Sequence, residues 1–411
     1  MREYLHRLID SQIEQALQEH PAVMITGPRA CGKTTTAARH AATLVRLDRP
    51  AEARVFQADP DAALKAQKAP ILLDEWQEVP EVLGAVKRQV DAESSPGRYL
   101  LTGSVRADLV AETWPGTGRV IRLDMHPLTM SERLSRQTST LIDRIADGLP
   151  LSPADETLDL RDYADLALTG GFPQPALRLS RSAQARWYES YAEQIATRDA
   201  PAVEQRRDPQ RMRRFLEAFA LNSAGVLPDK TIYDAAGLNR RTADAYARLL
   251  ANLGIVYELP AWSNFRFKRL SHISKRFLCD CGLLAAITGI RLDGLLKDAD
   301  LLGRFLETMV ATELRAQTPV AHMRHRLFHL RQQQGRHEVD LLAEGAAGKV
   351  VGIEVKASAA PGRHDARHLE WLRDGLGKRF LGGVVLHTGP ATYQIAEKVQ
   401  AAPISCLWSE N

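Results

Sequence analysis

A glycine-rich segment near the start of the chain carries the residue types of a phosphate-binding loop. Its members are Gly27, Pro28, Arg29, Ala30, Cys31, Gly32, Lys33 and Thr34. Glycines permit tight turns, so that successive backbone N–H groups can point at phosphate oxygens. Lys33 would reach the β- and γ-phosphates, and the Thr34 hydroxyl would ligate Mg²⁺. The segment therefore predicts binding of ATP with Mg²⁺, with Thr35 in the helix whose amino terminus faces the phosphates.

A pair of acids follows an apolar run about 40 residues further along, where a phosphate-loop enzyme needs them. Asp74 and Glu75 come directly after Ile71, Leu72 and Leu73. Asp74 would hold Mg²⁺, directly or through water, and Glu75 would act as the general base toward the attacking water. The alternative is a strand end with solvated acids, and the distance from the loop favours catalysis.

Two further positions are candidates for sensing the nucleotide. Thr102 and Ser104 follow a third apolar run, and a hydroxyl there could contact the γ-phosphate, although a plain turn explains them equally well. Arg119 or Arg122, in the next apolar stretch, could act as an arginine finger, with a solvated arginine as the alternative.

Strands alternating with helices must position these groups. Apolar spacing predicts an opening helix over residues 5–17 and helices near 34–44 and 82–90. Short apolar runs predict strands over 21–26, 70–74 and 98–102. This alternation indicates an α/β fold with a parallel sheet of the phosphate-loop AAA type.

The whole chain has the composition of a globular cytoplasmic protein. It has 411 residues, 45% of them hydrophobic and 25% charged, and a net charge of +4. No uncharged apolar run approaches the ~20 residues that span a bilayer, and no apolar signal core opens the chain. The spacing of the four cysteines matches no zinc site, so reduced thiols are expected.

The remainder of the chain divides into three predicted parts. After the ATPase domain, residues 1–135, we expect a helical linker or lid over 136–208. Three helices and a strand then predict a winged helix-turn-helix over 209–276. A long helix from about 300 to 316, followed by strands near 339–342, 350–355 and 383–386, predicts a second α/β domain over 277–411.

These motifs together resemble the prokaryotic AAA-superfamily ATPases that carry a C-terminal domain of uncharacterised function. The matching residues are 24–35, Leu72, 74–77, Pro80, 99–104, Gly118, Arg119, 126–128, 170–173, Arg198, Asp199, 338–340 and 354–356. Cys31 departs from the family, which more often has Thr or Ser there, but a small side chain still fits. The resemblance implies ATP binding and association with DNA, and leaves the biological process open.

Basic residues in the predicted winged helix could contact DNA. Asn239, Arg240, Arg241 and Thr242 open its third helix, where recognition helices contact the major groove. Two basic groups, suited to neutralising phosphates, lie nearby: Arg266, Lys268, Arg269, Lys275 and Arg276 around the wing, and Arg206, Arg207, Arg211, Arg213 and Arg214 before it. The alternative is a lid or protein-contact domain with solvated arginines.

Carboxylates near the C-terminus form a second predicted site. Adjacent strands could bring Asp340 and Glu354 together as Mg²⁺ ligands, with Lys356 activating water or stabilising the transition state. The arrangement looks similar to PD-(D/E)xK nucleases, whose extra helical acid would be Glu307, with Glu313 as its rival. The alternative is a nuclease-like fold that only binds, since fold does not imply function.

Two hypotheses for the function of the whole chain remain. In one, ATP hydrolysis drives a machine that binds DNA and whose last domain holds or cuts it. In the other, the chain is a slow ATP-dependent switch or protein-interaction module with an inactive last domain. A homo-oligomer is possible, because AAA-type sites are often completed by a neighbouring subunit's arginine, and the protein partner is unknown.

Overall fold

The computed structural model describes residues 4–103, 117–136, 139–154, 157–199, 208–264, 269, 272–332 and 336–409. The chain forms two compact units. The first comprises Met1–Leu128 with Arg248–Ile255, and the second comprises Thr129–Ala247 with Val256–Asn411. This division is coarser than the four domains expected from the sequence. Within the described ranges, no helix is both long enough and apolar enough to cross a membrane.

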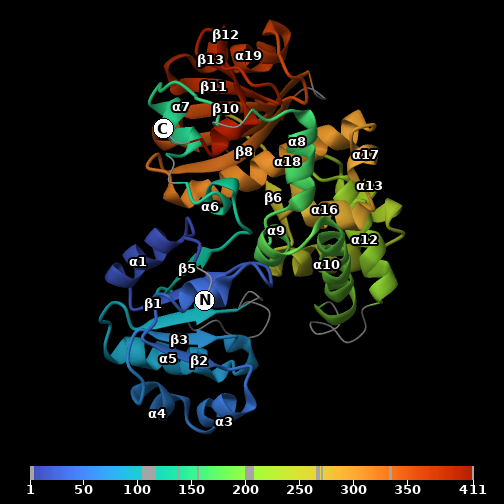
Figure 1. The fold of residues 1–411 in the computed structure, drawn as a ribbon. Helices are drawn as coiled ribbons and strands as arrows, with labels where there is room; N and C mark the ends of the chain where they lie inside the picture. Colours follow the sequence, from blue (N-terminus) through green and yellow to red (C-terminus); the bar gives the residue numbers. More distant parts are fainter. Residues whose placement is uncertain are drawn as a thin grey trace. The chain divides into compact units, whose positions relative to one another are not determined.

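A five-stranded parallel sheet forms the centre of the first unit (Figure 1). Its strands, in spatial order, are β2 (Thr43–Arg46), β3 (Ile71–Asp74), β4 (Tyr99–Thr102), β1 (Ala22–Thr26) and β5 (Val120–Asp124). Every neighbouring pair is parallel. Strands β1, β3 and β4 are buried along their whole length, as near-continuous apolar runs require. The predicted α/β fold with a parallel sheet is confirmed.

Helices pack around this sheet, and one of them is much shorter than its sequence indicates. The helices are α1 (Asp10–Glu19), α2 (Lys33–Ala37), α3 (Pro50–Ala58), α4 (Pro60–Lys65) and α5 (Glu81–Ala92). The helix predicted over residues 34–44 was wrong beyond Ala37, because Thr43 already begins β2. This strand lies at the sheet edge and is largely unburied, so it lacks the apolar run that marks a core strand.

The second unit begins with helices. They are α6 (Met130–Arg133), α7 (Leu141–Ala146), α8 (Leu160–Thr169), α9 (Pro173–Arg178) and α10 (Arg181–Gln194), followed by a π-helical turn over Ile195–Asp199. The turn between α8 and α9 depends on Gly170, which has a φ of +65°. A Cβ there would lie 2.2 Å from the Tyr188 hydroxyl, so no other residue fits. The helical segment predicted after the ATPase sheet is thus present.

Three helices and a small sheet follow in the order expected from the sequence. They are α12 (Pro209–Leu221), α13 (Asp229–Ala235), α14 (Arg240–Asn252), and β6 (Val256–Leu259) paired antiparallel with β7 (Lys275–Leu278). The side chain of Asn239 accepts a hydrogen bond from the backbone N–H of Thr242 at the start of α14, in the manner of an N-cap. Helices α16 (Cys281–Thr288) and α17 (Leu292–Leu295) then lead to the last part of the chain.

A mixed six-stranded sheet completes the second unit. Its spatial order is β12 (Tyr393–Ala396), β13 (Val399–Pro403), β11 (Phe380–His387), β10 (Val350–Val355), β9 (His337–Gly345) and β8 (His325–Gln332). Strands β10, β11 and β13 run parallel, whereas β8, β9 and β12 are antiparallel to their neighbours. Helix α18 (Ala299–Gln317) contacts β10, and α19 (Arg367–Leu376) packs on β9, β10 and β11. The expected second α/β fold is therefore present.

Candidate functional sites

The glycine-rich segment leaves the carboxyl end of β1 as a loop with positive φ angles at Gly27, Ala30 and Gly32. Gly27 has a φ of +153°, and a Cβ on it would lie 2.2 Å from the carbonyl oxygen of Met125. Gly32 has a φ of +105° and immediately precedes α2. Ala30 also adopts the left-handed region, with a φ of 62°. These conformations turn the chain sharply between β1 and α2, as a phosphate-binding loop requires.

Lys33 lies inside this loop. Its Nζ donates hydrogen bonds of 2.9 Å to each of the carbonyl oxygens of Gly27 and Pro28. The side chain is buried, so its ammonium group lies within the turn and has little contact with solvent. Of the other predicted loop residues, Cys31 is buried, and Thr35 is exposed on α2.

Asp74 joins the loop to two neighbouring strands. The Thr34 hydroxyl donates a hydrogen bond of 2.7 Å to Oδ1 of Asp74, and the Thr102 hydroxyl donates one of 2.6 Å to the same oxygen. The parallel register of β3 and β4 pairs Asp74 with Thr102, which explains the second contact. The hydroxyl and carboxylate oxygens fit Mg²⁺, which prefers such ligands. The structure thus brings together three residues that the sequence assigned to this site.

Glu75 is held in an unusual backbone conformation directly after β3. Its φ of 53° and ψ of 48° lie in the left-handed region, which is uncommon for a residue with a side chain and frequent at functional sites. Its carboxylate accepts a hydrogen bond from Nε2 of Gln77. Gly103 makes room for this turn, because a Cβ there would lie 2.5 Å from Oε1 of Gln77. Gln77 is therefore a positioning residue that sequence reasoning did not assign.

Arg7 is a second residue of this site without a sequence signal. Its Nη1 donates a hydrogen bond of 3.0 Å to the carbonyl oxygen of Cys31 in the loop, and its Nη2 donates one of 2.7 Å to that of His126. From the sequence alone, an arginine that precedes a helix cannot be distinguished from an arginine that is exposed to solvent.

Gly254 also approaches the loop within the same unit, where a Cβ would lie 3.1 Å from the backbone nitrogen of Pro28.

Arg119 is separated from the phosphate loop of its own chain. It precedes Val120, which pairs with Ala22 at the amino-terminal edge of the sheet, whereas the loop leaves the opposite edge. Four strand residues place these edges roughly 13 Å apart. Its Nε lies 2.5 Å from Oδ1 of Asp91 on α5. The predicted nucleotide contact by Arg119 is thus not made within one chain, and Ser104 lies outside the described residues.

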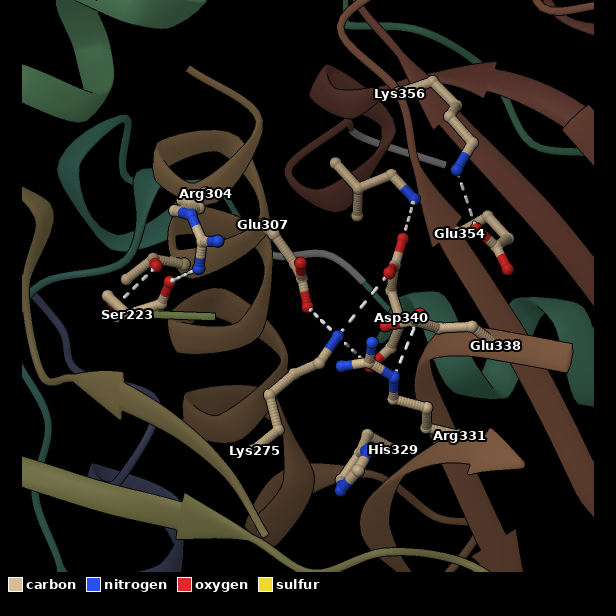
Figure 2. Close-up of polar contacts among 12 residues, drawn as sticks. Ser223, Lys275, Arg304, Glu307, His329, Arg331, Glu338, Asp340, Glu354 and Lys356 are labelled. Carbon is tan, nitrogen blue, oxygen red and sulfur yellow. Dashed lines mark hydrogen bonds and ion pairs between the residues drawn. The ribbon is translucent and has the colours of Figure 1, made fainter. Parts of the chain in front are cut away.

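The C-terminal carboxylates come together as the strand order predicts (Figure 2). In the antiparallel register of β9 and β10, Leu341 pairs with Ile353, so the next pair along is Asp340 and Glu354. Oδ2 of Asp340 accepts a hydrogen bond of 2.9 Å from the backbone N–H of Val355. Nζ of Lys356 lies 2.9 Å from Oε2 of Glu354. Asp340, Glu354 and Lys356 are therefore adjacent.

A lysine from β7 enters this cluster. Nζ of Lys275 lies 2.6 Å from Oε1 of Glu307 on α18 and 3.5 Å from Oδ1 of Asp340, as Figure 2 shows. Only 1% of Lys275 is exposed. Lys275 was expected on a DNA-binding wing, and its neighbours are carboxylates from α18 and β9. No periodicity in the sequence connects these distant segments.

Burial and neighbouring charges divide the cluster into ionised and neutral groups. Burial raises the pKa of Glu307 to about 8. Burial, followed by the charge of Asp340, also raises the pKa of Glu354. Burial opposes ionisation of Asp340 as well, but Lys275 and Lys356 outweigh it and lower the Asp340 pKa. Lys275 and Asp340 therefore form the charged pair at the centre of the cluster.

Of the two candidate acids on α18, Glu307 belongs to this cluster and Glu313 does not. Glu313 instead accepts a hydrogen bond of 2.8 Å from the backbone N–H of Met130, and burial raises its pKa to about 8. Among the described residues, no group of three or more His, Cys, Asp or Glu side chains is arranged to hold a metal ion. The Mg²⁺ site predicted from Asp340, Glu354 and Glu307 therefore does not fit the observed arrangement.

The predicted basic wing is also largely neutralised. Arg276 is 6% exposed and forms ion pairs with Asp229 and Glu258. Arg269 pairs with Glu344 at 2.6 Å. With Lys275 buried as well, the described members of this group are paired with carboxylates of the same unit, and their contact with DNA stays a prediction. Of the other basic candidates, Arg206, Arg207, Arg266 and Lys268 lie outside the described residues, as do the side chains of Arg198 and Asp199. Arg211 and Arg213 on α12 lie beside Asp208 and Glu193.

Comparison with known families identifies the first unit. Residues 19–134 match the AAA domain family, and this stretch contains the phosphate loop, Asp74, Glu75 and Thr102. Residues 19–134 therefore form an AAA-type ATPase domain, which implies nucleotide binding. Residues 160–293 match a domain of unknown function (DUF8612), and residues 302–407 match another (DUF4143).

Relatives extend over most of the chain. Uncharacterised proteins of Mycobacterium bovis and Mycobacterium tuberculosis are each 27% identical over 355 residues, which is 85% of this chain and 74% of the relative. A Walker-type ATPase of Pyrococcus abyssi is 15% identical, with a TM-score of 0.44, over 70% of this chain and 96% of that one. The assignment of the first unit rests on its domain match and on the geometry of the loop.

Proposed function

We propose that this protein hydrolyses ATP and uses the nucleotide state as a switch for the rest of the chain. The observation that carries the proposal is that the hydroxyls of Thr34 and Thr102 both donate a hydrogen bond to Oδ1 of Asp74 beside the phosphate loop. The three residues come from three separate segments. A chain that only needed a glycine turn would not require this buried carboxylate between two hydroxyls. Gly254, which follows α14, approaches Pro28 and offers a route by which the loop can report its state.

Each residue has a separate role in the proposed reaction. Lys33 and the loop amides would bind the β- and γ-phosphates. Thr34 and Asp74 would hold Mg²⁺, which neutralises charge on the phosphates. Glu75 would accept the proton of the attacking water, and Gln77 holds the Glu75 carboxylate in place through its amide hydrogen bond.

Phosphate release by purified variants tests the proposal. Lys33→Ala is expected to lose nucleotide binding, whereas Glu75→Gln is expected to keep it and lose turnover by about 100-fold or more. Glu78→Gln is the matched control, because Glu78 is an exposed acid on the same turn. Turnover in Glu75→Gln equal to that of the control would contradict the role of Glu75. Unchanged turnover in Lys33→Ala would contradict the ATPase assignment.

DNA binding through the start of α14 is a second candidate function. The winged-helix assignment of residues 209–276 is supported by three helices followed by an antiparallel pair of strands. The side chain of Arg240 is 89% exposed, and its nearest acid, Asp244, lies 3.6 Å away within the same helix. Arg240 and Arg241 therefore remain available to phosphates, unlike Arg276.

The salt dependence of binding tests this candidate. The double variant Arg240→Ala/Arg241→Ala is compared with Arg291→Ala/Lys297→Ala, which removes the same charge from another exposed surface. The first pair is expected to weaken binding to duplex DNA and to reduce the slope of log K against log salt by about 2. Equal slopes in the two double variants would argue against a DNA contact at α14.

The C-terminal cluster supports a nuclease-like domain, on the evidence of adjacent Asp340, Glu354 and Lys356. Cleavage would require Mg²⁺ between the carboxylates, and the observed arrangement favours a domain that binds without cutting. Incubating DNA with Mg²⁺ or Mn²⁺ and wild type or Asp340→Ala tests this. Cleavage that disappears in Asp340→Ala would establish a nuclease instead.

A further inference from the structure

We propose that Lys275 is a built-in cation that takes the place of a divalent metal ion among Glu307, Asp340 and Glu354. While β7 holds Lys275 there, the cluster binds no Mg²⁺ or Mn²⁺, and it becomes a divalent-cation site when Lys275 leaves. This inference concerns the second unit alone and does not depend on ATP hydrolysis by the first.

The first argument is the space that the ammonium group occupies. Nζ of Lys275 lies 2.6 Å from Glu307 and 3.5 Å from Asp340. A divalent ion that ligates both carboxylates must lie about 2.0–2.6 Å from an oxygen of each. Such an ion would have to lie between the same two carboxylates that Lys275 bridges. Lys275 and a bridging metal ion therefore exclude each other.

The second argument is charge. Three carboxyl groups and two lysines, Lys275 and Lys356, share this buried volume. Adding a divalent ion beside two ammonium groups would place three cations at close range, where burial strengthens their repulsion. Replacing Lys275 by a divalent ion would instead leave one lysine and one metal ion against three carboxylates, which is a neutral set when all are ionised. The cluster is thus suited to one of the two occupants.

The third argument is an oxygen that Lys275 does not satisfy. Within the part of the chain that the structure describes, Oε1 of Glu354 is buried and meets no hydrogen-bond donor, while Oε2 of the same carboxyl group meets Lys356. Buried carboxyl oxygens normally have a partner. Glu354 lies beside Asp340 on the neighbouring strand, so this oxygen is available as the further ligand that a metal ion needs and that a lysine on β7 does not reach.

Control of the site lies in β7. Lys275 is paired with Leu259 of β6 and is the first residue of its strand. Glu307, Asp340 and Glu354 belong to α18, β9 and β10, and their carboxyl groups would have to close around an ion once Lys275 has left. Displacement or a change in register of β7, in which neighbouring side chains point to opposite faces, is sufficient to remove Lys275. The two-stranded sheet is therefore a gate for the C-terminal cluster.

Titration of the full-length protein with Mn²⁺ in the absence of nucleotide, followed by electron paramagnetic resonance of the free ion, tests the inference. Wild type and Asp340→Asn should take up the same small amount of Mn²⁺. Lys275→Gln keeps a hydrogen-bond donor for Glu307 but removes the charge, and it should gain one bound Mn²⁺ per chain. The gain should disappear in Lys275→Gln/Asp340→Asn. Lys275→Met provides a second neutral variant, and circular dichroism identifies those that fold.

Two results would overturn the inference. One is Mn²⁺ uptake by wild type that Asp340→Asn removes, because the cluster would then bind metal with Lys275 in place. The other is a folded Lys275→Gln or Lys275→Met that takes up no more Mn²⁺ than wild type. Equal uptake by wild type and Asp340→Asn supports only the exclusion of the ion while Lys275 is in place, and the gain of Mn²⁺ in a folded neutral variant tests the cation site itself.

Discussion

The hydroxyl of Thr34 donates a hydrogen bond of 2.7 Å to Oδ1 of Asp74, which is 40 residues away along the chain. This contact connects the first turn of α2, which follows β1, with the end of β3. Because β1 and β3 run in the same direction within one parallel sheet, their carboxyl ends lie at the same edge of the sheet. It places the two expected Mg²⁺ ligands within direct reach of each other. The consequences of this relationship can be measured.

Replacing Asp74 by asparagine should separate nucleotide binding from hydrolysis. The amide oxygen can still accept a hydrogen bond from a threonine, so the fold should persist, but the charge that attracts Mg²⁺ is lost. We expect turnover to fall by about 100-fold or more, and Mg²⁺ should no longer tighten binding of a fluorescent ATP analogue. Asp91→Asn is the control, because Asp91 is a carboxylate at the opposite edge of the same domain. Equal losses in both variants would contradict a metal role for Asp74.

Gln77→Ala should impair catalysis without affecting substrate binding. Gln77 holds the Glu75 carboxylate through its side-chain amide. A freed carboxylate spends less time in the reactive position, so kcat should fall by about tenfold while KM stays within twofold. Gln89→Ala on α5, which removes an amide contact with Asp61 on α4, should change neither value. A rise in KM with an unchanged kcat would mean that Gln77 contributes to binding instead.

Gly27→Ala should destabilise the ATPase domain far more than Gly118→Ala. Both glycines have positive φ values, but a Cβ on Gly27 would lie 2.2 Å from the Met125 carbonyl oxygen, whereas no described residue lies within 4 Å of one on Gly118. The backbone strain alone costs about 1 kcal/mol, and the steric clash should add about 2 kcal/mol or more. Urea unfolding of each variant measures the difference. Similar losses would show that the loop relaxes around the added carbon.

Glu313 should make the stability of the second unit depend on pH. Its pKa is raised from an ordinary value to about 8 by burial. The folded chain therefore keeps this proton between about pH 4.5 and 8 while the unfolded chain releases it. This contribution is fully present below pH 4.5 and is lost as the pH rises toward 8.

Glu313→Gln isolates that effect. The neutral amide can still accept the hydrogen bond from Met130. As the pH rises from 5 to 8, the free energy of unfolding should therefore fall by about 2–4 kcal/mol less in the variant than in the wild type. Denaturant unfolding across this range, with the exposed Glu397→Gln as control, measures the slope. A wild-type slope equal to that of Glu313→Gln would mean that Glu313 is ionised in the folded protein.

Local patterns were sufficient to predict the ATPase site and most of the sheets. The phosphate loop needs glycines at set positions, and Asp74 ends a strand that is otherwise apolar because it is buried on both faces. The same kind of signal predicted β10 and β11. It was misleading for β2, which is exposed at the edge, and no strand was predicted at β8, β12 or β13.

The sequence by itself determined which chemistry the chain contains, because phosphate loops and paired acids are local patterns. Tertiary structure alone decided which charges meet. Lys275 and Arg276 are adjacent basic residues that suit a DNA-binding wing, yet one meets Glu307 and Asp340 and the other meets Asp229 and Glu258. Likewise, only the fold separates Arg119 from the loop and brings Arg7 to Cys31. The physical reason is that a charged side chain has the same local pattern whether it faces water or a distant carboxylate, and only packing distinguishes the two.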